Sequence, residues 1–306
     1  MIDSAVMLTV TSISRSFGAH RALDDVSFEV RPGRMTGFLG ANGAGKTTAM
    51  RIILGVLAAD SGSVTWDGRP VTQASRQRFG YMPEERGLYP KMRVAEQIAW
   101  LGQLHGLDRA AARRNTARLL DQLELAPRAD DKLEELSLGN QQRAQVAAAL
   151  VHDPVLLILD EPFSGLDPIA VETVLAVLRD RAASGVPVLF SSHQLAVVER
   201  LCDDLIIISE GEIAAAGERT ELRHRYGRTR YEMVVDSDAG WLRDLPGVRV
   251  LDLDGARAVL ELDDAADPGD GAGADQAVLR AALERGAVRT FAPVVPTLEE
   301  IFKEVV

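Results

Sequence analysis

A glycine-rich stretch near the start of the chain constrains its fold more than any other feature. Residues 40–48 read Gly-Ala-Asn-Gly-Ala-Gly-Lys-Thr-Thr, which is the G-x-x-x-x-G-K-T pattern of a phosphate-binding loop. An apolar run at residues 35–39 precedes it, and apolar residues at helical spacing follow it over residues 49–57. Such a loop curls its N–H groups around an anion, which requires torsions that glycine reaches without steric cost. The order of strand, loop and helix therefore predicts a phosphate site on an α/β core.

Two side chains of this loop have the chemistry that a bound polyphosphate requires. Lys46 can reach the β- and γ-phosphates of a nucleotide, and the Thr47 hydroxyl can ligate Mg²⁺. The helix that follows directs its positive end and its free N–H groups at the same phosphates. The alternative is an ordinary glycine-rich turn between a strand and a helix, and the flanking elements argue against it.

The composition excludes several classes of protein. Lys and Arg number 34 against 45 Asp and Glu, so the net charge of −11 argues against nucleic-acid binding and against adsorption to an anionic membrane by charge alone. The single cysteine, Cys202, allows no intrachain disulfide and no cysteine-based metal site. The sequence has no apolar run as long as a membrane span and no signal-peptide pattern. We therefore expect a cytoplasmic protein, and any membrane spans it needs must belong to another chain.

The carboxyl ends of two further apolar runs carry candidate catalytic groups. Residues 155–159 form an uninterrupted apolar strand that ends in Asp160 and Glu161. A strand buried on both faces belongs to a parallel sheet, whose ligands bind at the carboxyl ends of the strands, so both carboxylates are expected beside the phosphate loop. The alternative is a strand that simply meets solvent at its acidic end. His193 follows a similar run; a lone histidine there is usually structural, but this one is expected where a γ-phosphate would lie.

The remaining segments outline the domains. Strands with a turn at Asp67-Gly68 flank the phosphate loop, and residues 91–135 are rich in Arg, Ala and Leu at helical spacing, which predicts an inserted helical subdomain spanning about 91–150. The first domain covers residues 1–217, and the polar segment 218–230 is a candidate linker. Residues 231–306 alternate strands and helices without any chemical motif, which predicts a small α+β domain.

Over residues 7–217 the chain resembles the ATP-binding subunit of an ABC transporter, because the motifs of that family occur in order. It is most similar to the branch whose C-terminal extension ends in Leu-Glu-Glu-Ile-Phe, here residues 298–302, and which is often paired with exporter-type membrane subunits. The resemblance implies a P-loop NTPase of ABC type, with a parallel core sheet, an antiparallel β subdomain and an inserted helical subdomain. A small α+β domain then follows it.

The resemblance also implies a role for each motif around the nucleotide. Phe17 matches the aromatic residue that stacks on adenine, and Asp160 matches the carboxylate that holds Mg²⁺. Glu161 matches the general base that polarises the attacking water, and His193 matches the histidine that contacts the γ-phosphate. The Walker A loop of the family corresponds to Gly40, Asn42, Gly43, Ala44, Gly45, Lys46, Thr47 and Thr48.

Two further motifs imply a dimer. Asp167 lies in residues 164–167, which match the loop that crosses the dimer interface in this family. Residues 136–141 match the signature sequence, which binds the γ-phosphate held by the opposite subunit. The usual Leu-Ser-Gly-Gly-Gln is here Leu-Ser-Leu-Gly-Asn, so Ser137 and Gly139 are kept and Asn140 still supplies an amide donor.

A second departure concerns the metal. The family normally has a glutamine at the position of Glu84, where it touches Mg²⁺ and senses the membrane subunit. A carboxylate adds negative charge beside ATP, but it suits a hard cation. We expect Glu84 to remain a metal contact, together with Thr47 and Asp160.

Taken together, the resemblance implies an ATPase that uses ATP and Mg²⁺ to power a transporter, with export favoured by analogy. One chain has one Walker A loop and one signature, so a complete site needs two chains, and a homodimer is favoured. The protein is then expected on the cytoplasmic face of the membrane, bound to membrane-spanning subunits.

Other members of the same superfamily fit the sequence less well. A soluble ABC-type ATPase with a regulatory or translation-related role is the main alternative, although the translation ATPases normally carry two cassettes in one chain. A DNA-repair ATPase would need a long coiled-coil insertion. A module that only binds nucleotide would be expected to lose Glu161 or His193.

Overall fold

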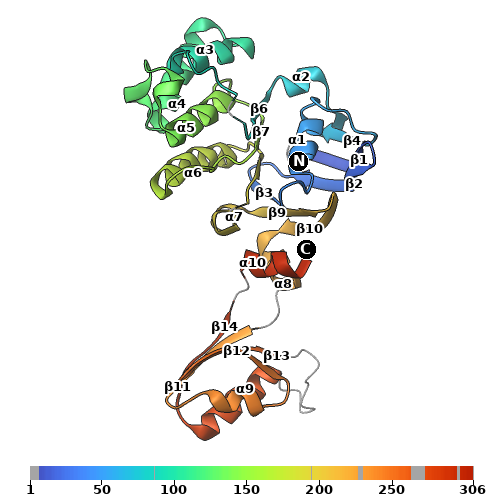
Figure 1. The fold of residues 1–306 in the computed structure, drawn as a ribbon, viewed down its shortest axis with the longest axis vertical. Coiled ribbons are helices and arrows are strands. Elements are labelled where there is room, and N and C mark those ends of the chain that lie inside the picture. The colour runs from blue at the N-terminus through green and yellow to red at the C-terminus, as the bar shows by residue number, and fades with distance from the viewer. Residues whose placement is uncertain are drawn as a thin grey trace, which may run out of the picture. The chain divides into compact units, whose positions relative to one another are not determined.

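A computed structural model describes residues 7–85, 87–193, 195–226, 230–262, 273–294 and 297–305 (Figure 1). The chain divides into two compact units between Arg219 and Thr220. Among the described residues, no helix is both long enough and apolar enough to span a membrane. Within the expected linker 218–230, the structure has a helix, α8 (Arg219–Tyr226), in which Leu222 is buried. One buried leucine in a polar segment is too weak a periodic signal for the sequence to reveal this helix.

A six-stranded sheet, in the order β10-β9-β3-β8-β7-β6, forms the centre of the first unit. β9 pairs antiparallel with β10 (Glu212–Glu218), and the other pairings are parallel. The parallel strands are β3 (Met35–Leu39), β6 (Phe79–Met82), β7 (Leu156–Leu159), β8 (Val188–Ser191) and β9 (Asp204–Ser209). β3, β7 and β8 are buried throughout, which explains their uninterrupted apolar sequences. The predicted parallel core is therefore confirmed, and the carboxyl ends of its strands meet at one edge.

A second, antiparallel sheet packs against the same core in the order β2-β1-β4-β5. Its strands are β1 (Leu8–Phe17), β2 (His20–Val30), β4 (Ser61–Trp66) and β5 (Arg69–Pro70). β4 and β5 turn at Asp67 and Gly68, which both have the positive φ that this hairpin requires. Side chains from this sheet, from α1 (Lys46–Ile53) and from the parallel sheet form one apolar cluster. The cluster fixes the start of α1 relative to both sheets.

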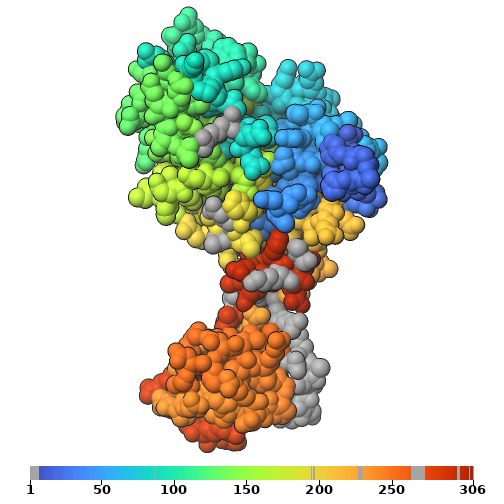
Figure 2. All heavy atoms as spheres, viewed as in Figure 1, coloured from blue at the N-terminus to red at the C-terminus, as the bar shows by residue number. Residues whose placement is uncertain are grey.

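The inserted helices form a distinct group in the first unit. They are α3 (Val94–Leu104), α4 (Arg109–Gln122) and α5 (Leu138–Leu150), with short 3-10 turns at Ala126–Arg128 and Leu133–Glu135 between the last two. Figure 2 shows this group, in green, on the opposite side of the unit from the blue antiparallel sheet. The helices α2 (Gln73–Arg76), α6 (Pro168–Ala183) and α7 (Leu195–Leu201) complete the first unit.

The second unit contains its own small core. A four-stranded antiparallel sheet runs in the order β12-β13-β11-β14, with β11 (Arg230–Val235), β12 (Val248–Asp254), β13 (Arg257–Leu262) and β14 (Val288–Val294). Met233 and Leu260 of the sheet are fully buried and share a cluster with Val278 of α9 (Ala274–Arg285). A 3-10 turn at Gly240–Asp244 and the terminal α10 (Leu298–Val305) complete the predicted α+β unit.

Two histidines join the helical subdomain to the edge of the parallel sheet. His105, at the end of α3, and His152, after α5, stack with ring centroids 3.7 Å apart. Nδ1 of His105 donates to the Gln77 carbonyl at 2.8 Å, and Nε2 of His152 donates to the Phe79 carbonyl at 3.2 Å. Nδ1 of His152 is buried and makes no hydrogen bond with any described residue. Burial, and secondarily the neighbouring His105, lowers the pKa of His152 to about 4, although the hydrogen bond to the Phe79 carbonyl and, to a lesser extent, Asp153 oppose this shift.

The free energy of unfolding should therefore decrease as the pH falls below neutrality. Because the folded pKa of about 4 lies below the ordinary 6.5, the unfolded chain binds more protons in this window, and stability rises with pH across it. Between pH 7.5 and 5.0 the wild type should lose about 1–2 kcal/mol more than His152→Gln, after allowance for solvent around a partly exposed ring. Urea unfolding at both pH values measures this difference. The exposed His20, replaced by Gln, serves as the control, and equal losses in wild type and His152→Gln would contradict the account.

Candidate phosphate-binding and catalytic site

The loop between β3 and α1 has the backbone of an anion-binding turn. Gly43 and Gly45 have φ values of +83° and +111°, a region that other residues rarely adopt. Gly45 is the N-cap of α1, where no side chain caps the helix and no acidic residue occupies the first turn. The first N–H groups of a helix have no carbonyl partner within it. The uncapped end of α1 therefore fits a negatively charged ligand such as a phosphate.

Lys46 carries the positive charge of this loop. Its Nζ donates to the carbonyl oxygens of Gly40 at 2.6 Å and Ala41 at 3.0 Å, so the loop curls around its own lysine. Burial lowers the pKa of Lys46, while the carboxylates of Glu161, Asp160 and Glu84 act in the opposite direction. A poorly solvated ammonium group is stabilised by an anionic ligand. The nearby carboxylates repel such an anion, so a ligand that binds together with a cation fits this site best.

Asp160 links the loop to two strands of the sheet. It directly follows β7 and is 1% exposed. Its Oδ2 accepts from Thr47 Oγ1 at 2.9 Å, and its Oδ1 accepts from Ser191 Oγ at 2.5 Å. Ser191, the last residue of β8, was missed in the sequence analysis. A hydroxyl that interrupts an apolar strand at its carboxyl end is the signal that would have identified it.

Glu161 and His193 face each other at the same edge of the sheet. His193 Nδ1 lies 2.9 Å from Glu161 Oε2, and the imidazole is 58% exposed whereas the carboxylate is 10% exposed. The backbone of Glu161 has a φ of +52°, an uncommon conformation for a residue other than glycine. Its N–H donates to Ser191 Oγ at 2.9 Å. The structure thus brings together the two carboxylates and the histidine that the sequence analysis singled out.

The oxygen atoms beside Lys46 fit a hard cation such as Mg²⁺. They are the hydroxyl of Thr47 and the carboxylate of Asp160, with the exposed Glu84 close enough to act on the pKa of Lys46. The described residues contain no group of three or more His, Cys, Asp or Glu side chains that could hold a metal. A cation at this position would therefore draw further ligands from phosphate oxygens and water.

Phe17 lies at the end of β1 and is 49% exposed. The Arg15 guanidinium lies 5.0 Å from the centre of its ring, and Arg15 Nη1 is anchored to Asp60 Oδ1 at 2.6 Å. The cation on the ring orients Phe17 and leaves part of an aromatic surface in solvent, where a planar base can stack.

The signature residues lie at the start of α5 and pack against the loop before α6. Ser137 caps α5 by accepting from the Asn140 N–H at 3.4 Å, and Asp167 caps α6 by accepting from the Ala170 N–H at 2.8 Å. Gly139 lies against Gly165 and Leu166 of the loop before α6, where an added Cβ would be 3.7 and 3.5 Å from them. In Figure 1, α5 and α1 lie on opposite sides of β6 and β7.

Comparisons with known proteins cover both units. Residues 23–164 match the family model of the ABC transporter, and residues 217–306 match the C-terminal domain of DrrA1-3-like ATP-binding proteins. The chain is 37% identical to an uncharacterised ABC transporter ATP-binding protein, YhaQ, of Bacillus subtilis, over 97% of this chain and 98% of that one. It is 36% identical to the Nod factor export ATP-binding protein I of Ralstonia nicotianae, over 82% and 77% of the two chains.

Another relative and one solved structure agree with this result. The linearmycin resistance ATP-binding protein LnrL of Bacillus subtilis is 36% identical over 72% of each chain. A solved structure of an ATP-binding subunit of an ABC transporter matches with a TM-score of 0.67 and 32% identity, over 72% of this chain and 93% of that one.

Two glycines of the loop should respond differently to alanine. A Cβ at Gly45 would lie 2.7 Å from the Ala22 carbonyl oxygen, whereas a Cβ at Gly43 meets no atom within 4 Å. Gly43→Ala should therefore cost only the torsional strain of about 1 kcal/mol, and Gly45→Ala at least about twice as much because a clash is added. Equilibrium unfolding in urea measures both, and equal losses would contradict the loop geometry.

Proposed function

The chain belongs to the ATP-binding proteins of ABC transporters, which hydrolyse ATP, and from this premise we propose that it powers an exporter whose membrane-spanning subunits are separate chains. The observation that carries the proposal is the arrangement of Lys46, Thr47, Asp160 and Glu161 at one edge of the sheet, with the signature helix α5 on the other side of β6 and β7 from α1 (Figure 1). Two of the relatives are named for Nod factor export and linearmycin resistance, which supports export.

The site residues divide the work of hydrolysis between them. Lys46 and the free N–H groups of α1 stabilise the negative charge that spreads over the γ-phosphate. Glu161 orients the attacking water and takes its proton, since its carboxylate is partly desolvated and lies at the strand end. His193, hydrogen-bonded to Glu161, donates to the γ-phosphate when the nucleotide is bound. Thr47, Asp160 and Glu84 would hold Mg²⁺, which neutralises charge on the β- and γ-phosphates.

A second chain completes the site. Ser137, Gly139 and Asn140 lie at the start of α5, and this helix lies on the other side of β6 and β7 from α1 (Figure 1). Leu138 in this segment is 56% exposed, although it is large and apolar. Two copies in head-to-tail arrangement bring each signature to the other's γ-phosphate, so that ATP bridges a homodimer. ATP binding closes this dimer, hydrolysis opens it, and the movement drives the membrane subunits.

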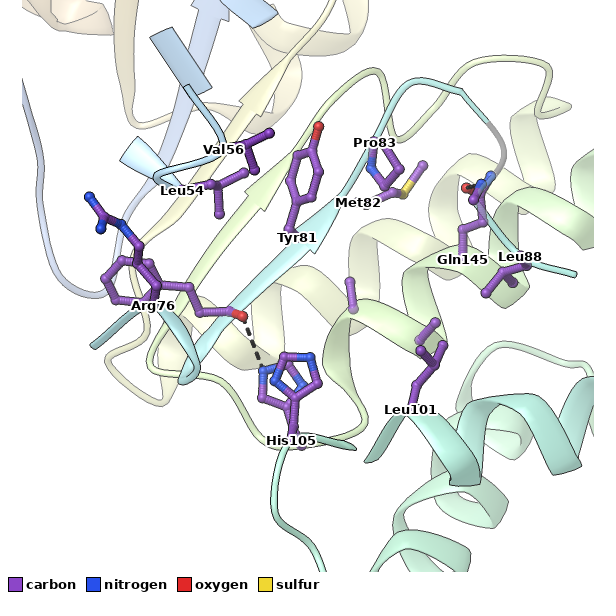
Figure 3. A pocket seen from close by; sticks show the side chains of 15 residues that line it. Leu54, Val56, Arg76, Tyr81, Met82, Pro83, Leu88, Leu101, His105 and Gln145 are labelled. Carbon is purple, nitrogen blue, oxygen red and sulfur yellow. Dashed lines mark hydrogen bonds between the residues drawn. The ribbon is translucent and has the colours of Figure 1, made fainter. Parts of the chain in front are cut away.

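A groove in the first unit offers a place for the membrane subunits to dock. It has a volume of about 370 Å³ and lies between β6 and the helices α3 and α5, where Val56, Leu88, Leu101 and His105 line it (Figure 3). Val56, which lines the groove, is exposed although it is large and apolar, and so are Tyr89, next to Leu88 in the sequence, and Leu104 of α3. Apolar surface of this kind marks a protein interface. We assign it to a cytoplasmic segment of the membrane subunit, which would hold this chain at the cytoplasmic face of the membrane.

Glu161→Gln tests the mechanism and the dimer together. The amide keeps the shape of the side chain but accepts no proton, so hydrolysis should fall at least about a hundredfold while ATP still binds. In size-exclusion chromatography with ATP the variant should elute as a dimer, and with ADP as a monomer. A variant that remains a monomer in ATP would count against the dimer, and one that hydrolyses at the wild-type rate would remove Glu161 from the mechanism.

Glu84→Gln tests the proposed metal contact. Loss of this charge should raise the Mg²⁺ concentration for half-maximal ATPase activity roughly two- to fivefold, since Glu84 is exposed and its interaction is screened. The neighbouring exposed carboxylate, Glu85, replaced by Gln, is the matched control. A Mg²⁺ titration that does not distinguish the two variants would exclude a special role for Glu84.

A further inference from the structure

The backbone of Glu161 is held in place by two buried side chains. Its left-handed torsion persists only where surrounding groups over-determine it. On one side, the N–H of Glu161 donates to Ser191 Oγ at 2.9 Å. On the other side, Gln142 Nε2 donates to the Glu161 carbonyl oxygen at 2.9 Å. Gln142 belongs to α5, the helix that the signature residues begin.

Gln142 is one link in a chain of hydrogen bonds that all run in the same direction. The N–H of Gly87 donates to Gln145 Oε1 at 3.3 Å, and Gln145 Nε2 donates to Gln142 Oε1 at 3.3 Å. Gln142 Nε2 then donates to Glu161. Both glutamines are buried, at 4% and 6% exposure. Each amide accepts at its oxygen and donates from its nitrogen, so the bonds polarise one another in a low-dielectric environment.

The end of this hydrogen-bond series that is opposite Glu161 lies at the groove. Gly87 and Gln145 both line it, together with Pro83 and Leu88 of the loop after β6. Figure 3 shows the Gln145 side chain extending from α5 toward the loop that bears Leu88. Glu84 belongs to the same loop. The chain of amides therefore begins at the wall of the groove and ends on the backbone of the catalytic carboxylate.

We propose that Gln142 and Gln145 are positioning residues that couple the loop beside the groove to the conformation of Glu161. The inference rests on the proposed role of Glu161 as the base. When the loop holds Gln145, the amides hold the Glu161 carbonyl, and the carboxylate stays beside His193. When the loop moves away, the series of amide hydrogen bonds loses its first donor, the Gly87 N–H. Glu161 can then leave its left-handed torsion and turn its carboxylate away from the attacking water. A partner in the groove would thereby control hydrolysis without touching the nucleotide.

The first test compares kcat with KM for ATP in the purified full-length chain. Gln142→Met and Gln145→Met keep the length of the side chain but remove the amide. Each should lower kcat roughly tenfold while KM changes less than twofold, because the γ-phosphate site is untouched. The kcat of the double variant should be no lower than that of the slower single variant, since both changes break the same series of hydrogen bonds.

Gln97→Met is the matched control. Gln97 is also buried and holds the same loop, because its amide accepts from the Tyr89 N–H at 2.5 Å and donates to the Tyr89 carbonyl at 3.3 Å. It has no hydrogen bond to the glutamine chain among the described residues. Its replacement should change kcat less than twofold, which separates general support of the loop from the coupling that we propose.

Gln142→Glu provides a second variant that preserves shape. A carboxylate cannot donate to the Glu161 carbonyl, but a protonated carboxyl group can. Because burial raises the pKa of a carboxyl group, the ratio of variant to wild-type kcat should increase several-fold between pH 8 and pH 6. A packing role alone predicts a constant ratio. This variant also serves if Gln142→Met does not fold.

The outcomes separate this inference from the proposed function. Unchanged kcat in Gln142→Met and Gln145→Met, with Glu161→Gln inactive, would overturn the coupling and leave the catalytic role of Glu161 intact. Losses that multiply in the double variant would show that the glutamines act independently, and would also overturn it. Wild-type hydrolysis by Glu161→Gln would instead overturn the proposed function on which the inference rests.

Discussion

The hydrogen bonds that Asp160 accepts hold the site together. One carboxylate oxygen accepts a hydrogen bond from the Thr47 hydroxyl of α1, and the other accepts one from the Ser191 hydroxyl of β8. Three segments far apart in the sequence therefore meet on a side chain that is almost fully buried. A buried carboxylate is costly unless its oxygens are satisfied, so the fold is constrained to keep these partners in place. The same contacts place an acidic group beside the lysine of the phosphate loop, and their oxygen atoms have the chemistry that a hard cation prefers.

Much of this arrangement could be predicted from the sequence because its signals are local. The phosphate loop needs glycines at set positions, and the buried parallel strands are short apolar runs that end in acidic residues or histidine. The carboxyl ends of parallel strands lie at the same edge of a sheet. The position of Glu161 near the phosphate loop therefore follows from the parallel order of the strands. The Asp67-Gly68 turn was predicted for the same reason, since two residues suffice to specify it.

The missed features depend on contacts that no local pattern encodes. Ser191 closes an apolar strand and Gln142 and Gln145 are ordinary polar residues of a helix, so their importance appears only when α5, β7 and β8 pack together. The helix α8 was expected to be a linker because a single buried leucine, Leu222, is its apolar anchor. The stacked histidines, too, are 47 positions apart in sequence, at His105 and His152, and only the packing of α3 on α5 brings them together.

The central claim of our account is that one chain holds only half of a hydrolytic site. The phosphate loop lies beside Asp160, and Lys46 lies within the field of Glu161, the proposed base, whereas α5, which the signature residues begin, lies on the other side of β6 and β7 from α1 (Figure 1). The most direct measurement is the ATPase rate per chain over a hundredfold range of chain concentration at saturating ATP and Mg²⁺. If two chains form the site, the rate per chain should rise with concentration and then level off as the dimer saturates. A rate per chain that is constant from the lowest concentration upward, with the protein monomeric throughout, would contradict the account.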